Sequence, residues 1–206
     1  MLTDYVGIGR RQREVSITDV DTLSRFLGSR ASHVAQASLY GYLRTRAGTR
    51  FPTLFENPDL LKSINFAKWH IWLACVSDLG IYIGQIMHQS GELDEAEIQT
   101  IMRSAVDQLF EDTGVPEEAG PDFDGAREKV TQRINTCDWT QERDDDTVFS
   151  NSPDALFYWS PIADELKERD EEIVKNSIRY RWIETRRSTR QLLDCEGLAA
   201  NLEMQA

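Results

Sequence analysis

The stretch WHIWLACVSDLGIYIG, residues 69–84, is the most apolar part of the sequence, yet it contains His70, Ser77 and Asp78. Its apolar residues cover nearly the whole circumference of a helix, which is typical of a core helix or a membrane span. A span needs about 20 mostly apolar residues. A charged carboxylate at its centre costs about 2.5–3.5 kcal/mol, whereas each Leu, Ile or Val favours insertion by only about 0.3–0.6 kcal/mol. Because Asp78 lies at that centre, we predict a buried bundle helix and no transmembrane segment.

The pattern around this stretch predicts an all-α fold, a bundle of four to five main helices around a buried central helix at about residues 58–90. A first long helix is expected at about residues 19–46, capped by Thr18. Others are expected at 94–113, at 123–135, from Ser152 to about residue 159, and from Ser160 to about residue 193. Residues 1–17 are predicted to be a polar arm and 18–193 a single helical domain. Within the domain, 137–153 is predicted to be an acidic surface loop, and 194–206 a frayed tail.

Local signals fix where several helices begin and end. Asn57 followed by Pro58 is typical of an N-cap with a first-turn proline, and Gly91 is expected to end the same helix. Asp94 with Glu97 forms a capping-box pattern. On the first helix, small residues share one side, which predicts close packing of another helix there: Gly28, Ala31, Ala35, Ser38 and Gly41.

A carboxylate on a buried helix needs a partner or stays protonated, since an unpaired buried charge is costly. For Asp78 the arginine-rich first helix offers Arg30, Arg44 and Arg46 as candidates. We therefore predict that a structural ion pair or hydrogen bonds satisfy Asp78, and that its loss lowers the melting temperature.

The composition indicates a compartment and limits the partners. The 206 residues carry a formal net charge of −12, which disfavours a dedicated nucleic-acid binder. The charge is uneven: residues 1–50 hold 8 Lys/Arg against 4 Asp/Glu, and residues 101–150 hold 5 against 13. Three scattered cysteines without a CxxC motif suit a reducing cytosol and predict neither a disulfide framework nor a zinc site. We predict a cytoplasmic protein without cofactor or metal.

A search for catalytic motifs leaves few candidates. None of the three histidines follows an acidic residue by three positions, so the Glu-x-x-His pattern of di-iron bundles is missing. Gly-x-Ser-x-Gly, Ser-x-x-Lys and the phosphate-binding loop are missing as well. His70 and Ser77 share a helix face but lie about 10 Å apart along its axis, too far for a direct nucleophile–base pair. His70, Asp78 and His33 remain candidates for an unconventional hydrolase site.

Residues 30–84, from RASHVAQASLYGYLRTRAG to WHIWLACVSDLGIYIG, are similar to a family of short, soluble, uncharacterised bacterial helical proteins. Some of its members are labelled esterase, without a known mechanism. The resemblance implies a helical fold and an esterase alternative, and it assigns no site residue. The short motif Trp-His-Ile-Trp, residues 69–72, also resembles helical assembly chaperones of respiratory complexes.

Two basic, aromatic helix faces are typical of contact surfaces, because Tyr and Arg anchor interfaces. The predicted partner-binding residues are Arg30, Tyr40, Arg44 and Arg46 on the first helix and Arg179, Arg181, Trp182 and Arg186 on the last. The sequence thus favours a non-catalytic protein-interaction, assembly or regulatory role, with a protein partner or a second copy, and leaves peripheral membrane contact open. The alternatives are an esterase-like hydrolase near His70 and Asp78, and a small-ligand sensor with a Trp-rich core.

Overall fold

The structure, a computed structural model, describes residues 15–141 and 145–204. These residues confirm the all-α bundle: they form helices and no strand beyond one isolated bridge between Ile17 and Leu193. The longer helices are α1 (Val20–Ala47), α2 (Pro58–Ser90), α3 (Glu95–Thr113), α4 (Phe123–Asn135) and α8 (Glu171–Leu192). The shorter ones are η1 (Gly48–Glu56), η2 (Glu117–Ala119), α5 (Asp145–Val148), α6 (Asn151–Trp159), α7 (Asp164–Lys167), η3 (Glu168–Asp170) and α9 (Cys195–Glu203).

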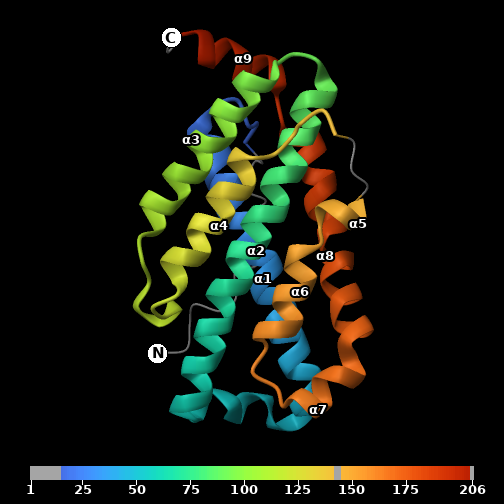
Figure 1. Cartoon of the computed structure of the whole chain (residues 1–206). Coiled ribbons are helices and arrows are strands. Elements are labelled where there is room, and N and C mark those ends of the chain that lie inside the picture. Colours follow the sequence, from blue (N-terminus) through green and yellow to red (C-terminus); the bar gives the residue numbers. More distant parts are fainter. Residues whose placement is uncertain (1–14, 142–144, 205–206) are drawn as a thin grey trace.

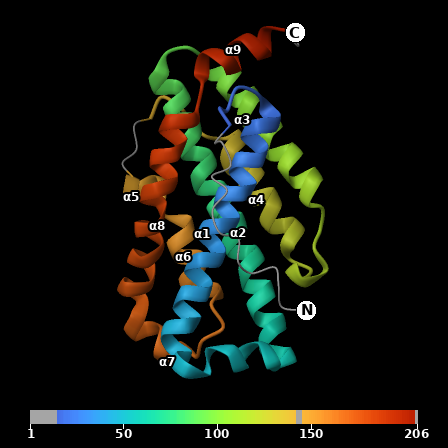
Figure 2. The same cartoon turned by 180° about the vertical axis from the view of Figure 1, so that it is seen from behind.

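The long helix α2 lies at the centre, as the sequence predicts. α3 and α4 flank it on one side and α6 and α8 on the other, while α1 covers its back (Figure 1). Seen from behind, α1 runs beside α8 over its lower half, and α7 lies at the lower end of the bundle (Figure 2). α2 meets the length and composition of a membrane span, but 89% of its most apolar 18-residue window is buried inside the bundle. The neighbouring helices therefore cover the apolar surface that a bilayer would otherwise cover.

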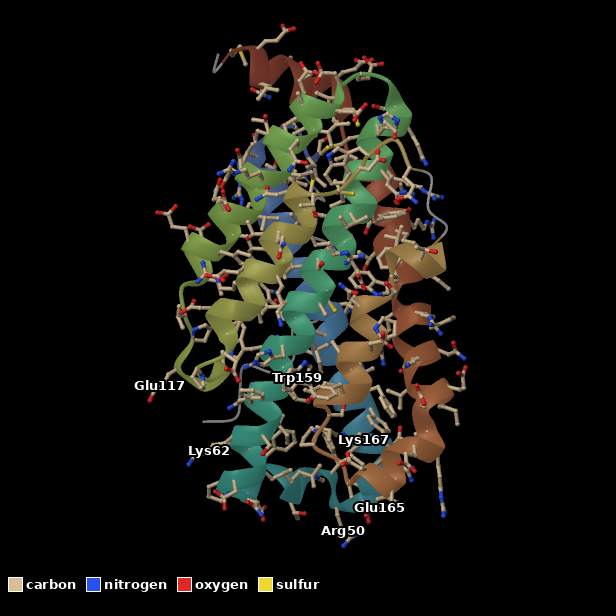
Figure 3. The ribbon with its side chains drawn as sticks, viewed as in Figure 1. Arg50, Lys62, Glu117, Trp159, Glu165 and Lys167 are labelled. Atoms are coloured by element: carbon tan, nitrogen blue, oxygen red, sulfur yellow. The ribbon has the colours of Figure 1, made fainter. Side chains whose placement is uncertain are left out.

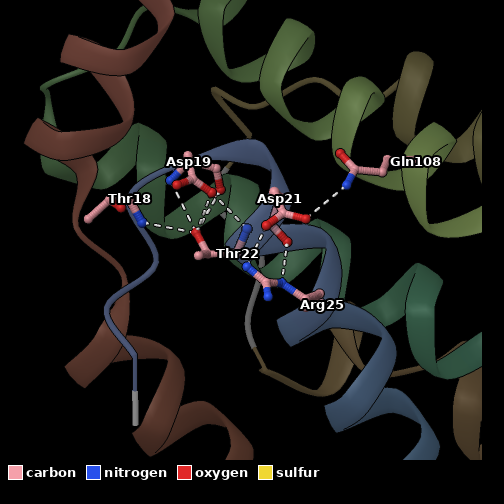
Figure 4. A network of polar contacts seen from close by, with 6 residues as sticks. All are labelled: Thr18, Asp19, Asp21, Thr22, Arg25 and Gln108. Atoms are coloured by element: carbon pink, nitrogen blue, oxygen red, sulfur yellow. Dashed lines mark hydrogen bonds and ion pairs between the residues drawn. The ribbon is translucent and has the colours of Figure 1, made fainter. Parts of the chain in front are cut away.

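The start of α1 corrects one prediction, since Asp19 and not Thr18 caps this helix. The Thr22 N–H donates to Asp19 Oδ1 at 2.7 Å, and the Asp19 N–H donates to Thr22 Oγ1 at 3.2 Å. This reciprocal pair satisfies two backbone donors that a helix start leaves free. Within the same first turn, Gln108 of α3 donates to Asp21 Oδ1 at 3.1 Å and links α1 to α3 (Figure 4).

The predicted caps of α2 and α3 are confirmed. Asn57 Oδ1 accepts from the N–H groups of Asp59 and Leu60, at 3.0 and 3.1 Å. Gly91 ends α2 in the left-handed conformation, with φ +74°. The Asp94–Glu97 capping box begins α3. These ends were predictable because each depends on residues within four positions of one another.

The predicted helix from Ser160 to residue 193 is interrupted. Ser160 and Ala163 have ψ values of 126° and 138°, so the chain is extended at both before α7 begins. Pro161 contributes, because the residue before a proline is driven away from the helical region. After α7 and η3, α8 begins only at Glu171.

Both predicted ends of the domain need correction. In the N-terminal arm, residues 1–14 lie outside the described residues, but Ile17 is buried and its N–H donates to the Leu192 carbonyl at 2.7 Å. The predicted frayed tail contains α9, which Asp194 caps: its Oδ1 accepts from the Gly197 N–H at 3.0 Å. Leu198 of this helix is only 2% exposed. Burial of apolar side chains holds both segments to the bundle, although the local sequence pattern gives little indication of it.

The predicted acidic loop, residues 137–153, is partly wrong. Trp139, Val148 and Phe149 are buried, and α5 lies within the segment. Residues 142–144 lie outside the described residues. Acidic and turn-forming neighbours concealed the three apolar anchors in the sequence.

Candidate functional site

Asp78, on α2, is fully buried and satisfied by three neighbours. Arg133 of α4 donates from Nη1 to Asp78 Oδ1 at 2.8 Å and to the Ser77 hydroxyl at 2.8 Å. The N–H groups of Ser152 and Asn151, at the start of α6, donate to Oδ2 at 2.7 Å and to Oδ1 at 3.3 Å. The predicted ion pair is therefore present, but the predicted partners Arg30, Arg44 and Arg46 are wrong.

This arrangement is structural in character. The carboxylate takes the place of an N-cap for α6, accepting backbone donors that Ser150 leaves unmet. Burial raises the pKa of the Asp78 carboxyl, while Arg133 and the Ser152 N–H act in the opposite direction. Every hydrogen bond that these neighbours make with the Asp78 carboxylate is donated to it, so the contacts satisfy it as an acceptor.

His70 is 5% exposed and packed among aromatic rings. Its ring stacks on Trp159, with centroids 4.4 Å apart, and lies 4.4 Å from the Phe66 ring. Its Nε2 lies 3.2 Å from the Ala119 carbonyl oxygen, so the tautomer with a proton on Nε2 fits. Burial lowers the pKa of His70, which keeps the ring neutral at pH 7.

The three weak catalytic candidates are not brought together. His70 and Asp78 are eight residues apart on α2, about 12 Å along the axis, and each is held by different neighbours. His33 is exposed on α1. No hydrogen bond joins a serine to His70 within the described part of the chain. The geometry thus offers no nucleophile–base pair at these residues.

The predicted contact residues of α1 lie along its length. The Arg30 guanidinium is 5.3 Å from the centre of the Phe26 ring, and Arg44 is 5.9 Å from that of Phe51. Tyr40 meets the Phe55 ring edge-on at 6.1 Å. Arg46 pairs with Asp170 and donates to the Leu166 carbonyl at 2.9 Å.

On α8 one predicted contact residue is wrong. Trp182 is 1% exposed and donates from its indole to the Ser152 hydroxyl at 3.0 Å, so it belongs to the core. Arg186 lies over the Phe149 ring at 5.8 Å. Arg179 donates to Asn176 Oδ1 at 3.0 Å. Arg181 is exposed, and no hydrogen bond or ion pair holds it among the residues that the structure describes.

The two predicted surfaces meet in a pocket of about 350 Å³ between the lower halves of α1 and α8. Arg46 and Arg181 both line it, one from each helix. The Asp170 carboxylate also reaches it, but Arg46 pairs with this group and the Tyr42 hydroxyl donates to it at 3.0 Å. Its negative charge is therefore largely neutralised, and Arg181 remains as an unpaired cation.

Ser38 and Gly41 complete the pocket from α1. Ser38 is 2% exposed and lines the cavity, and its hydroxyl has no hydrogen-bond partner among the described residues. A Cβ at Gly41 would lie 3.1 Å from Arg181 Nη2, so this glycine lets the guanidinium approach the α1 backbone. The small-residue side of α1 is thus only partly used for close packing. At Gly28, a Cβ would lie 2.7 Å from Leu109 of α3, whereas Ser38 and Gly41 line the pocket.

A second pocket, of about 770 Å³, lies in front of the His70 cluster. Phe66 and Trp159 form its aromatic wall, and Glu117 and Lys62 lie at its edge. Figure 3 shows Trp159 between α2 and the lower end of α6. Lys68 of the same region already reaches Glu118 at 3.9 Å. Since charges of both signs surround it, this pocket selects no class of ligand.

Sequence reasoning missed Ser38, Tyr42 and Asp170 as site residues. The sequence identifies Ser38 only as a small residue on one side of the first helix. Whether its hydroxyl has a hydrogen-bond partner depends on how α8 packs against α1, which the sequence does not show. Among the described residues, no three His, Cys, Asp or Glu side chains gather so as to hold a metal ion.

The chain matches no family model, no curated protein sequence and no solved structure. The resemblance to bacterial helical proteins therefore stays a prediction, and the functional argument depends on the geometry.

Proposed function

We propose that this protein is a non-catalytic binding module that holds an acidic segment of a protein partner in the cytoplasm. It would use the surface around the pocket between α1 and α8, here called the α1–α8 face: Arg44, Arg46, Ile173, Tyr180 and Arg181. The observation that carries this proposal is that Arg46 and Arg181, predicted from separate parts of the sequence, line one pocket. No described residue forms a hydrogen bond or ion pair with Arg181 that binding would have to break.

Apolar side chains beside the pocket support a protein partner over a free ion. Ile173 and Tyr180 of α8 are 71% and 75% exposed. They are seven residues apart and so share one face of the helix. Exposed aromatic and aliphatic groups next to arginine are the usual anchors of protein interfaces.

Charge supports an acidic partner. Residues 179–190 hold five arginines and one glutamate, although the whole chain carries −12. A basic face on an acidic molecule orients an approaching acidic segment, because the rest of the surface repels it. The same overall charge disfavours nucleic acid and an anionic membrane.

The test is comparative affinity capture from the source cells with the full chain and two charge reversals, Arg44→Glu and Arg181→Glu. We expect acidic proteins that the wild type retains to be lost with both variants. The matched control is Arg103→Glu on α3, where Arg103 is exposed and lies 3.6 Å from Asp107. Retention by Arg103→Glu but not by the other two supports the proposal.

Two outcomes would overturn it. If all variants retain the same acidic proteins, the α1–α8 face is not the binding surface. If sedimentation shows that the wild type self-associates and that Arg181→Glu abolishes this, the partner is a second copy of the chain. In parallel, a fluorophosphonate probe tests the esterase alternative. A stoichiometric adduct on one serine, lost in His70→Ala or His33→Ala, would make the protein an enzyme.

A further inference from the structure

The pocket between α1 and α8 contains a specific set of free hydrogen-bond donors. Arg181 offers its guanidinium, and Ser38 offers a buried hydroxyl that no described residue engages. Two other hydroxyls of the pocket are occupied: Thr45 donates to the Gly41 carbonyl at 3.0 Å, and Ser177 to that of Val174 at 2.7 Å. Among the residues that the structure describes, the free groups of the pocket are thus one cation, from α8, and one neutral donor, from α1.

The unpartnered Ser38 hydroxyl needs an explanation. A buried hydroxyl without a partner costs free energy, and most such groups in folded proteins are satisfied. On a helix, serine commonly donates to a carbonyl one turn back, as Thr45 does on the same helix. Ser38 does not, although it lines the cavity. A buried hydroxyl without a partner at the wall of a pocket calls for an explanation, and a bound ligand would supply the missing partner.

The charges around the pocket select a monoanion. Arg181 presents the fork that matches a carboxylate with two parallel hydrogen bonds. Asp170 lies in the same pocket, and Arg46 and Tyr42 already hold it. The two arginines and Asp170 leave a net charge of +1, which one carboxylate neutralises and a doubly charged phosphate would exceed. Ile173 and Val174 supply an apolar wall against which a short methylene chain can pack.

We infer that this pocket binds the side-chain carboxylate of a glutamate, with Arg181 as the bidentate partner and Ser38 as the second donor. The inference rests on the proposed function, since the glutamate belongs to the acidic segment of the partner. Gly41 is a positioning residue, because its missing side chain lets the guanidinium lie against α1.

The test uses N-acetyl-glutamate amide as the probe and N-acetyl-glutamine amide as its neutral isostere. Each is titrated into the ¹⁵N-labelled full chain at constant ionic strength, and the amide shifts of Ser38 and Gly41 are followed. We expect saturable shifts with the glutamate probe and none with the glutamine probe. Inorganic phosphate, titrated in the same way, is expected to bind more weakly.

Three variants complete the experiment. Arg181→Gln is expected to abolish the shifts, and Ser38→Ala to weaken binding several-fold without lowering the melting temperature. Arg187→Gln, an exposed arginine on the same helix that does not line the pocket, is the matched control and is expected to bind as the wild type does.

Equal responses to the two probes, tighter binding of phosphate, or binding that survives Arg181→Gln would overturn the inference. A lower melting temperature in Ser38→Ala would show that the Ser38 hydroxyl stabilises the fold and is not kept for a ligand. If the probe binds but no acidic protein depends on Arg181, the pocket stands and the proposed function fails. If the partner is captured but the probe does not bind, the proposed function stands and the glutamate pocket fails.

Discussion

At the residue scale, the core of this bundle is organised around a buried charge. Asp78 joins three helices, since Arg133 reaches it from α4 and the Ser152 N–H from α6. Such a network replaces apolar packing where the three elements meet, and its value depends on every member being satisfied. The residue is therefore more sensitive to substitution than its position in an apolar stretch suggests.

Asp78→Asn is expected to destabilise the protein. It leaves Arg133 without a counter-charge and weakens the acceptor for the start of α6. Breaking a buried pair costs about 3–5 kcal/mol, and the lower end applies because the Arg133 side chain is 28% exposed. For a chain of this size that corresponds to about 6–12 °C in melting temperature, measured by circular dichroism.

The matched control is Asp107→Asn. Its ion pair with Arg103 is exposed on both sides, so its loss should change the melting temperature by only a degree or two. Identical melting curves for Asp78→Asn and the wild type would contradict the structural role of the network.

His70 predicts a dependence of stability on pH. Burial lowers the pKa of His70 in the folded state, so the unfolded state binds the proton first as pH falls. Its stabilising contribution is full above the unfolded pKa of about 6.5 and is lost as pH falls from there towards the folded pKa. We expect the melting temperature to decrease in that range, and to decrease less in His70→Gln. Parallel pH profiles of the two proteins would exclude His70 as the cause.

At the scale of the element, the helices differ in how their glycines are used. Gly84 of α2 faces Trp139, so a methyl there would lie 2.7 Å from Cε3 and Cη2 of that ring and nearer still to Cζ3. Gly125 of α4 has nothing within 4 Å of the same added atom. One glycine therefore allows a close approach, and the other only lowers helix propensity.

Gly84→Ala and Gly125→Ala are expected to act in opposite directions. Overpacking at Gly84 should lower the free energy of unfolding by about 1–3 kcal/mol. Gly125→Ala should raise it by about 0.5 kcal/mol, because alanine restricts the unfolded chain and favours the helix. Urea denaturation of both variants checks this. Stabilisation by Gly84→Ala would contradict the packing of Trp139 on α2.

The C-terminal element gives a second prediction. Leu198 of α9 is 2% exposed, and Asn201 donates to the Thr18 carbonyl at 2.9 Å, so α9 closes the end of the bundle. Leu198→Ala should cost about 2–3 kcal/mol by urea denaturation, near the low end for a buried leucine. The exposed Met204, changed to alanine, is the control and should have almost no effect. A frayed tail would make both variants neutral.

At the scale of the whole molecule, charge is spread unevenly along the chain. Residues 101–150, which include most of α3 and all of α4, hold 5 Lys/Arg against 13 Asp/Glu, whereas α8 lies on the other side of α2 (Figure 1) and holds five arginines at residues 179–190. This uneven distribution has little effect on stability, because most of the charges are exposed and screened.

Salt is therefore expected to affect binding and stability differently. The affinity for an acidic partner should fall steeply as ionic strength rises, since the Debye length shortens from about 10 Å at 0.1 M to about 3 Å at 1 M. The melting temperature should change little, because Asp78 is fully buried and the exposed charge pairs contribute little to stability. Calorimetric titrations at several salt concentrations check the first part. Affinity independent of salt would contradict an electrostatic face.

The sequence by itself determined the all-α class, the central position of α2 and the ends of several helices. Each of these depends on local chemistry: Asn57 and Asp94 satisfy donors within three residues, and the apolar circumference of residues 69–84 has to be buried. Only the tertiary structure decided which arginine meets Asp78, that Trp182 is buried, and that Ser38 and Arg181 line one pocket. The Asp78–Arg133 bond spans 55 residues. Such contacts depend on how the helices lie against one another, which no local pattern specifies.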